Sequence, residues 1–402
     1  MKAVRATYLI VANISILLIA VEGMAHLAIR TYERLVPTLA YRRLSQPAKA
    51  SYAHLTPSEV NELLRATRAL RFRYTQEAGF VEEAMTSRFV NVDSHGIRSN
   101  GNGARDIDRL QNSIWFLGGS TAFGYGIADH ESIPAHLEQR LGRPVTNLSV
   151  RAHTSALENQ LLSHYLRIGY RPALAIFLDG INETCDTKMF GDQIDDVVVK
   201  AQDGYRWQFA TPVLYAHARI SRKLRSAMGY AVDPPEPLEL ECEGAGLRTP
   251  LRTLHARASA ERDALCRLYQ IDCRTFVQPF AGLHGRHDDV DSQDREYMRG
   301  LFEHLEPGWR QAGAVFVTGA LDGLQRHAFV DNAHYNRDAS RDFGSLRAAA
   351  DAILVCSDGL RPDEVIERGS LRDAAAEQQG AERAVGPHVA HRVDPNECAA
   401  RR

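Results

Sequence analysis

The stretch IWFLGGS, residues 114–120, passes from an apolar run directly into two glycines and a serine. A short apolar run that ends at such a turn is typical of a strand buried on both faces. Similar runs recur at 145–150 and 174–178, and amphipathic segments at about 132–141 and 155–165 separate them. Apolar runs that alternate with amphipathic helices indicate a parallel sheet covered on both faces.

The alternation continues later in the chain, after one interruption. Residues from about 184 to 251 lack the pattern, and we expect them to form an insertion over the functional site. The pattern then resumes, and the expected elements are a strand near 274–277, a helix at about 293–312, a strand at 314–317 and a last helix at about 344–354. Residues 357–402 are rich in Ala, Arg, Glu and Gly with little apolar periodicity, which predicts disorder. The expected domain therefore spans 113–356.

An apolar segment at 8–29 is long enough to cross a hydrocarbon layer of ~30 Å as a helix. Asn13, Glu22 and His26 interrupt it, and a charge in lipid is costly unless it lies near one end. A cleavable secretory signal is the alternative, because basic residues precede an apolar centre. No small-x-small cleavage site follows, so we expect residues 1–30 to form one uncleaved transmembrane helix.

The compartment is harder to infer than the anchor. Lys2 and Arg5 favour a cytoplasmic N-terminus, whereas arginines on the other flank oppose it. A basic start before an apolar run is typical of export signals, and large domains cross membranes largely regardless of charge. We therefore expect an extracytoplasmic domain, periplasmic if the source is a bacterium. Cys242, Cys266 and Cys273 lie close enough in sequence for a bridge in such a space, with unpaired buried thiols as the alternative.

Residues 31–112 are expected to link the anchor to the domain and to pack against it. Thr56-Pro57-Ser58-Glu59 has the pattern of a capping box with proline at the first helical position, and apolar residues follow along one stripe. The segment 89–93, followed by His95-Gly96, predicts a short strand and a turn that lead into the core.

Several chemically useful residues follow predicted buried strands, where the carboxyl ends of parallel strands meet. Ser120 follows the first strand and Asn182 the third. A serine hydroxyl needs a base to take its proton, and the attacked carbonyl becomes an oxyanion that needs donors. The side-chain amide of Asn182 can donate without titrating. The backbone N–H of Ala152, close to a predicted helix start, can donate as well.

Asp331 and His334 supply a base and an orienting acid. Residues three apart in a helical turn lie on one face, so this segment can present the imidazole to Ser120 and hold the carboxylate beside it. Each stretch alone is equally compatible with an ordinary turn. Two other nucleotide- or ester-binding patterns do not fit, because a P-loop needs a lysine here and the Gly-x-Ser-x-Gly elbow needs glycine where Ala122 stands.

Taken together, these stretches resemble the blocks of the SGNH (GDSL-like) hydrolases, over about residues 113–354. Gly118-Gly119-Ser120 resembles the serine block of the family, residues 180–183 resemble its Gly-x-Asn-Asp block, and residues 331–334 resemble its Asp-x-x-His block. The resemblance implies a three-layer α/β/α sandwich and ester hydrolysis through an acyl-enzyme. The implied roles are Ser120 as nucleophile, His334 as general base and acid, Asp331 as orienter, and Ser120, Ala152 and Asn182 as oxyanion donors.

Two positions depart from the family pattern. Ala152 stands where the family has glycine, and alanine costs about 1 kcal/mol or more if the backbone there needs a positive φ. Glu183 stands where the family has aspartate. The first departure leaves the level of activity open.

The function we expect is that of an acyl- or acetyl-esterase acting on cell-envelope or exopolysaccharide esters, lipid or acylated glycan, with no cofactor and no metal. An acyltransferase to a glycan hydroxyl would use the same residues if the insertion excluded water. A non-catalytic, membrane-tethered binding or assembly protein on the same fold is the third possibility. The formal net charge of −2 gives no basic excess for binding nucleic acid.

Overall fold

The computed structural model describes residues 2–185 and 248–344, apart from short gaps at 36–38, 43, 76–77, 102–105, 282, 285–291, 322–323, 325 and 332. Most of the predicted insertion at about 184–251 lies outside the described residues. The same is true of the tail at 357–402 and of all but the first residue of the helix expected at about 344–354.

Five parallel strands form the central sheet, in the order β4-β3-β5-β6-β7. They are β3 (Ile114–Gly118), β4 (Val145–Asn147), β5 (Leu174–Asp179), β6 (Cys273–Val277) and β7 (Val315–Phe316). In register, Ile114 pairs with Val145 on one side and with Leu174 on the other. The chain therefore reverses its winding direction between β3 and β5, and in open α/β sheets ligands bind at the carboxyl ends of strands at such a switch point.

Helices cover both faces of this sheet. Alternate residues of β3 point to opposite faces: Ile114 and Phe116 join one buried cluster, and Trp115 and Leu117 join another. The first cluster includes residues of α6 (Ile133–Leu141) and α13 (Arg337–Gly344), and the second includes residues of α7 (Ser155–Arg167) and α11 (Arg248–Tyr269). α12 (Ser292–Gln311) packs beside α11 and buries Trp309 against Val277. The predicted three-layer α/β/α architecture is confirmed.

The segment before the sheet packs onto it. It contains α2 (Leu39–Arg42), α3 (Gln46–Ser51), α4 (Pro57–Ala69), the antiparallel pair β1 (Phe72–Thr75) and β2 (Gly79–Glu82), and the short helix η1 (Asp106–Arg109). The predicted capping box is present, with the Thr56 hydroxyl accepting from the Glu59 N–H and the Glu59 carboxylate accepting from the Thr56 N–H. Tyr52, Val60 and Leu63 share a buried cluster with residues that follow β3.

The strand and turn expected at 89–96 form a tight hairpin at the edge of the sheet. Val92 bridges Arg98, and Arg98 in turn bridges Asn147 at the end of β4. The Asp93 carboxylate closes the turn by accepting hydrogen bonds from the backbone N–H groups of His95 and Ile97. The hairpin thus carries Arg98 into the interior.

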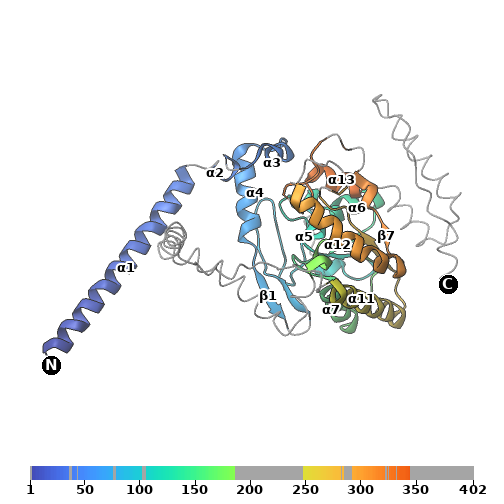
Figure 1. Cartoon of the computed structure of the whole chain (residues 1–402), viewed down its shortest axis with the longest axis horizontal. Coiled ribbons are helices and arrows are strands. Elements are labelled where there is room, and N and C mark those ends of the chain that lie inside the picture. Colours follow the sequence, from blue (N-terminus) through green and yellow to red (C-terminus); the bar gives the residue numbers. More distant parts are fainter. Residues whose placement is uncertain are drawn as a thin grey trace.

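The first helix extends away from the sheet domain (Figure 1). α1 (Lys2–Leu35) is one 34-residue helix, and its side chains Ile16, Leu17 and Ile19 are exposed. Among the residues that the structure describes, no helix combines the length and the apolar character needed to cross a membrane. The transmembrane helix predicted for residues 1–30 is therefore not supported, and polar residues at 13, 22 and 26 interrupt its apolar run.

Candidate active site

Ser120 lies at the first position of α5 (Ser120–Phe123), immediately after β3 and the N-cap residue Gly119. The first N–H groups of a helix have no acceptor within that helix, so the Ser120 N–H is a potential donor at the sheet edge. A Cβ on Gly119 would come within 1.9 Å of Asn182 Nδ2, and one on Gly118 within 2.5 Å of the Cβ of Ala122. Close packing thus requires both glycines, in addition to the sharp turn that the sequence suggested.

The structure brings Ser120, His334 and Asp331 together. His334 Nε2 lies 2.7 Å from Ser120 Oγ, across 214 residues of sequence. On the other side of the ring, His334 Nδ1 lies 2.8 Å from each carboxylate oxygen of Asp331. These distances are short enough for a proton to pass from the serine to the imidazole.

The ionisation state of the Asp331 carboxyl determines which ring nitrogen of His334 donates to it. Burial raises the pKa of the Asp331 carboxyl, but hydrogen bonds from the His334 ring and from the N–H groups of Ala333 and His334 outweigh this effect and hold the pKa below its ordinary value. An ionised carboxylate only accepts hydrogen bonds, so His334 Nδ1 carries the proton and donates it. In the neutral ring, His334 Nε2 is then the acceptor nitrogen that faces the serine hydroxyl, as a general base requires.

Asp331 and His334 do not lie in the helical turn that the sequence analysis assumed. Antiparallel pairing of Phe329 with Tyr335 closes a tight turn around them, and the Val330 N–H donates to the His334 carbonyl at 2.8 Å. Within the turn, Asp331 Oδ1 accepts from the N–H groups of Ala333 and His334, each at 2.9 Å. The three-residue spacing still brings carboxylate and imidazole together, through these local side-chain-to-backbone bonds.

The segments that carry the two other predicted oxyanion donors, Asn182 and Ala152, lie in contact. Asn182, at the start of η3 (Asn182–Cys185), donates from Nδ2 to the His153 carbonyl at 2.6 Å. The same Nδ2 lies against Gly119, as the short distance to a Cβ at that position shows. An amide nitrogen has two N–H groups, so one fixes the loop of Ala152 and His153 while the second can face the reacting carbonyl.

Ala152 has the backbone conformation that its sequence position put in question. Its φ is +61°, in the left-handed region that costs L-residues roughly 1 kcal/mol or more. The loop adopts this conformation nonetheless, held by the His153 N–H donating to the Val150 carbonyl and by the bond from Asn182. Ala152 thus adopts a backbone conformation that glycine would adopt without this cost.

His153 is excluded as an alternative base, although it adjoins the oxyanion loop. It is fully buried, and its Nε2 lies 2.8 Å from the Phe80 carbonyl on β2. A carbonyl only accepts, so Nε2 carries the proton. Burial lowers the pKa of His153 to about 4, only partly opposed by the bond to Phe80, so the ring is neutral and its Nε2 is bonded to Phe80.

A buried carboxylate supports the oxyanion loops from behind. Glu183 Oε2 accepts from the Gly180 N–H at 2.5 Å, which fixes the turn that carries Asn182. Its Oε1 accepts from the N–H and the hydroxyl of Ser155, at 2.9 and 3.0 Å. Since Ser155 begins α7 directly after the Ala152 loop, the Glu183 carboxylate connects the two segments that carry the candidate oxyanion donors Ala152 and Asn182.

Arg262 on α11 completes this cluster. Its guanidinium donates to both oxygens of Asp179, at 3.1 and 3.0 Å, and to Glu158 at 3.0 Å. Ligand atoms of Glu158, Asp179 and Glu183 lie within 4.8 Å of one another, a spacing that could suit a metal ion. Arg262 is the cation that the fold itself supplies there.

Arg262, Asp179 and Glu158 support the site but were not predicted from the sequence to do so. Their contacts join residues 83 and 104 positions apart, and no local pattern marks such pairs. A weak signal exists in Asp179, a charged residue at the end of an otherwise apolar strand that is buried throughout.

No protein-family model matches the chain. No match was found among curated proteins. Among solved structures, the chain is similar to a carbohydrate acetylesterase from Sinorhizobium meliloti, with 12% identity, a TM-score of 0.34, and coverage of 61% of this chain and 100% of that one. It is similar to an M. smegmatis aryl esterase, with 13% identity, a TM-score of 0.33, and coverage of 60% and 98%. It is also similar to a member of the lipolytic G-D-S-L family from Veillonella parvula, with 10% identity, a TM-score of 0.32, and coverage of 58% and 94%. These similarities are distant, and they add nothing to the chemistry of the site itself.

Proposed function

We propose that the protein is a serine ester hydrolase that acts through an acyl-enzyme, with Ser120 as nucleophile. The observation that carries this proposal is the continuous chain of contacts from Ser120 Oγ to His334 Nε2, at 2.7 Å, and from His334 Nδ1 to Asp331, at 2.8 Å. Nucleophile, base and orienter come from separate loops, and their convergence at one sheet edge supports a catalytic role over an ordinary turn.

In the first half of the reaction, Ser120 Oγ attacks the ester carbonyl carbon while its proton passes to His334 Nε2. The carbonyl oxygen becomes an oxyanion, for which the N–H groups of Ser120 and Ala152 and the amide of Asn182 are the donors. The tetrahedral intermediate then expels the alcohol, which takes the proton from His334. The acyl group remains on Ser120, and Asp331 stabilises the transient imidazolium.

In the second half, water attacks the acyl-enzyme. His334 takes a proton from the water, the same donors stabilise the second oxyanion, and Ser120 leaves as the alcohol when His334 returns the proton. The products are a carboxylic acid and an alcohol. A glycan hydroxyl in place of water would give acyl transfer by the same steps.

The substrate class we propose is an acyl or acetyl ester of a cell-envelope lipid or glycan. The distant structural neighbours include a carbohydrate acetylesterase and an acetyl xylan esterase. Short and long p-nitrophenyl esters, acetylated oligosaccharides and phospholipids together span the proposed class. Product analysis with and without added oligosaccharide separates hydrolysis from transfer.

The test of the reaction itself is covalent labelling of the full chain by a fluorophosphonate, followed by ester turnover. Labelling should depend on Ser120, and Ser120→Ala should lose both labelling and at least about a thousandfold in kcat. Ser94→Ala is the matched control, because Ser94 is an exposed serine on the hairpin turn. Absence of labelling in the unmodified protein, or equal labelling of Ser120→Ala, would exclude the enzyme and favour a binding or assembly role.

We propose an extracytoplasmic location for this activity. A disulfide joins Cys266 at the end of α11 to Cys273 at the start of β6, seven positions apart. Disulfides persist mainly in oxidising compartments. This bridge supports an exported domain whether residues 1–30 are retained or removed.

The location can be tested with an alkaline phosphatase reporter fused after the full chain, because that enzyme becomes active only when exported. An active reporter, together with Cys266 and Cys273 that resist alkylation until reduced, is expected. An inactive reporter with freely alkylated thiols would place the domain in a reducing compartment. Ser120→Ala should leave both readouts unchanged, which keeps this test independent of catalysis.

A further inference from the structure

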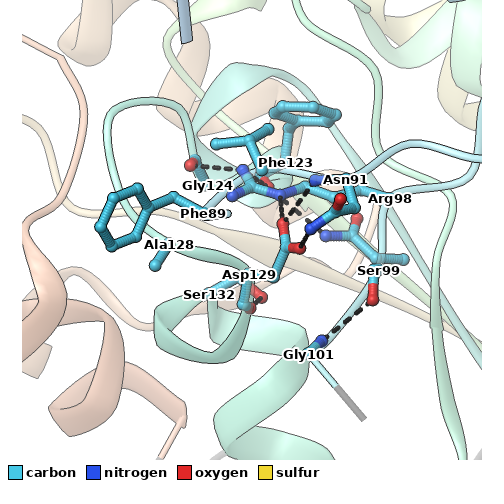
Figure 2. A network of polar contacts seen from close by, with 12 residues as sticks. Phe89, Asn91, Arg98, Ser99, Gly101, Phe123, Gly124, Ala128, Asp129 and Ser132 are labelled. Carbon is cyan, nitrogen blue, oxygen red and sulfur yellow. Dashed lines mark hydrogen bonds and ion pairs between the residues drawn. The ribbon is translucent and has the colours of Figure 1, made fainter. Parts of the chain in front are cut away.

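We infer that Arg98, which lies outside the predicted hydrolase domain, is a positioning residue that fixes the nucleophile turn and the loop beside His334; the inference rests on the proposed function of Ser120. Arg98 is fully buried, and it comes from the hairpin of the segment before the sheet. Figure 2 shows its guanidinium at the centre of a network that includes Phe123, Gly124 and Asp129.

The contacts of Arg98 converge on one short loop. Its Nη1 donates to the carbonyls of Phe123 and Gly124, at 2.7 and 2.5 Å, and its Nη2 donates to the carbonyl of Ile127 at 2.7 Å. Its Nε donates to Asp129 Oδ1 at 3.1 Å. Four bonds from one side chain therefore fix the stretch that begins at the last residue of α5.

This loop continues directly from the nucleophile. Gly124 caps α5 with a left-handed φ of +84°, and the N–H groups of Gly124 and Tyr125 both donate to the Ser120 carbonyl at 3.0 Å. A Cβ on Gly124 would lie 3.1 Å from Arg98 Nη1. Any shift of the guanidinium is thus passed through Gly124 to the backbone of Ser120.

The same loop reaches the catalytic base. The ring of Tyr125 lies 4.7 Å from the His334 ring, centroid to centroid. Gly126 packs against Val330, which precedes Asp331, and its carbonyl accepts from the Tyr52 hydroxyl at 2.9 Å. Arg98 on one side and Tyr52 on the other therefore hold the loop between the nucleophile and the base.

The geometry suits arginine and no other side chain. The guanidinium N–H groups of Arg98 donate to three backbone carbonyls. Its Cζ lies 4.6 Å from the centre of the Phe123 ring. Arginine offers five donors in a rigid plane, whereas lysine offers one compact ammonium group. Lysine at this position would keep the charge beside Asp129 but could not bind all three carbonyls.

A purely structural role is the alternative, since a buried arginine also contributes to stability. The two roles differ in what they predict for kinetics. A positioning role affects the reacting atoms, where a displacement of about 1 Å can lower the rate by roughly a hundredfold. A structural role lowers the melting temperature and leaves kcat intact well below it.

The test compares Arg98→Lys with two variants of the same segment in the full chain. Ile97→Ala removes a buried side chain of the same hairpin, outside the loop contacts, and serves as a matched destabilised control. Arg88→Lys alters an exposed arginine that pairs with Glu59. Rates of fluorophosphonate labelling, kcat and KM for a p-nitrophenyl ester, and melting temperature are measured for each variant at 20 °C or more below its melting point.

For Arg98→Lys we expect a tenfold to hundredfold fall in kcat and in labelling rate, with KM within about twofold of the unmodified protein. Ile97→Ala should lower the melting temperature by at least as much while kcat stays within twofold, and Arg88→Lys should change neither. If Ile97→Ala loses kcat in proportion to stability as Arg98→Lys does, or if Arg98→Lys keeps full kcat, Arg98 has only a structural role. Absence of labelling in the unmodified protein would instead contradict the proposed function.

Discussion

Two buried arginines support the two halves of the candidate site, and they do so in different electrostatic surroundings. Arg98 holds the nucleophile half through three backbone carbonyls and the single carboxylate of Asp129. Arg262 holds the oxyanion half, where three carboxylates gather around one guanidinium. Each guanidinium also stacks on a phenylalanine ring, at 4.6 Å for Phe123 and 3.9 Å for Phe177. The arginines are alike, but their partners are not.

The difference concerns how each half responds to protons. The Arg98 guanidinium donates to one carboxylate, that of Asp129, and otherwise to neutral carbonyls. The Arg262 centre would hold two excess negative charges if Glu158, Asp179 and Glu183 were all ionised, which burial disfavours. Burial, together with the charge of Asp179, raises the pKa of Glu183 to about 7 and that of Glu158 well above its ordinary value.

Glu158 shows the consequence in its hydrogen bonds. Its Oε2 accepts from Arg262, whereas its Oε1 is buried without a partner. A protonated carboxyl explains that oxygen better than an ionised one, because an unpaired buried charge is far more costly than a neutral hydroxyl. The oxyanion half therefore carries bound protons near neutral pH.

Replacing each arginine with methionine is the most direct test of whether the two centres differ in their response to pH. Arg262→Met leaves a cluster of buried carboxylates without a cation, and we expect a loss of about 3–5 kcal/mol in the free energy of unfolding near pH 8. The loss should shrink toward pH 5, where protonation neutralises the cluster. Arg98→Met should also destabilise, by removing the positive charge beside Asp129 and the four hydrogen bonds to Asp129 and three carbonyls, but about equally at both pH values. Denaturant unfolding at pH 5 and pH 8 measures both.

Arg310→Met is the control for that experiment. Arg310 pairs with Glu306 on the exposed side of α12, and such pairs contribute roughly 0–1 kcal/mol. It should therefore change stability little at either pH. Equal pH responses of Arg262→Met and Arg98→Met would show that the two centres do not differ in proton uptake.

The second effect concerns Glu183 alone. Its pKa in the folded protein, about 7, lies above the ordinary value of 4.5, so the folded state binds this proton more tightly than the unfolded state does. The stability it contributes is complete below pH 4.5 and is lost as the pH rises to about 7. Relative to Glu183→Gln, which cannot titrate, the unmodified protein should lose on the order of 2 kcal/mol between pH 5 and 7. Unfolding free energies of both proteins across this range provide the measurement.

Glu59→Gln is the control for this dependence of unfolding free energy on pH. Hydrogen bonds from the backbone and hydroxyl of Thr56 lower the pKa of Glu59, so its titration falls below pH 4.5. Between pH 5 and 7 this variant should follow the unmodified protein. A Glu183→Gln curve parallel to that of the unmodified protein would mean that Glu183 is already ionised throughout the range.

The sequence was sufficient for the parts of the site that depend on local pattern. β3 and β5 are apolar runs that end in turns, and parallel strands end at one edge, so Ser120 and Asn182 were predictable as neighbours. The capping box at Thr56 and Glu59 is local too. The left-handed φ of Ala152 could not be determined from the sequence, because the backbone conformation of a short loop depends on the residues that pack around it.

The sequence was insufficient where identity depends on tertiary contact. The chain has 48 lysines and arginines, most residues of these types are exposed, and neither Arg98 nor Arg262 is distinguished by its neighbours in sequence. Their burial depends on partners that folding brings together, as for Arg262 and Asp179, 83 positions apart. For the same reason the turn at 331–334 was assigned a helical form, since pairing of Phe329 with Tyr335 cannot be inferred from a three-residue spacing.

The smallest expected effect on stability concerns Ala152, in the oxyanion half of the candidate site. Ala152→Gly removes the cost of a left-handed backbone, offset in part by the greater freedom of glycine in the unfolded chain, so we expect a gain of about 0.5–1 kcal/mol in unfolding free energy. Ala156→Gly, one residue into α7 in ordinary helical conformation, should instead lose roughly that amount. Denaturant unfolding and ester turnover distinguish two accounts of the strain. If Ala152→Gly is more stable and turns over esters at the same rate, the strain is a cost that Glu183 and Asn182 already overcome in placing the amide. If turnover rises severalfold, the alanine holds the oxyanion amide out of position, and the bonds from Glu183 and Asn182 are not sufficient to align it.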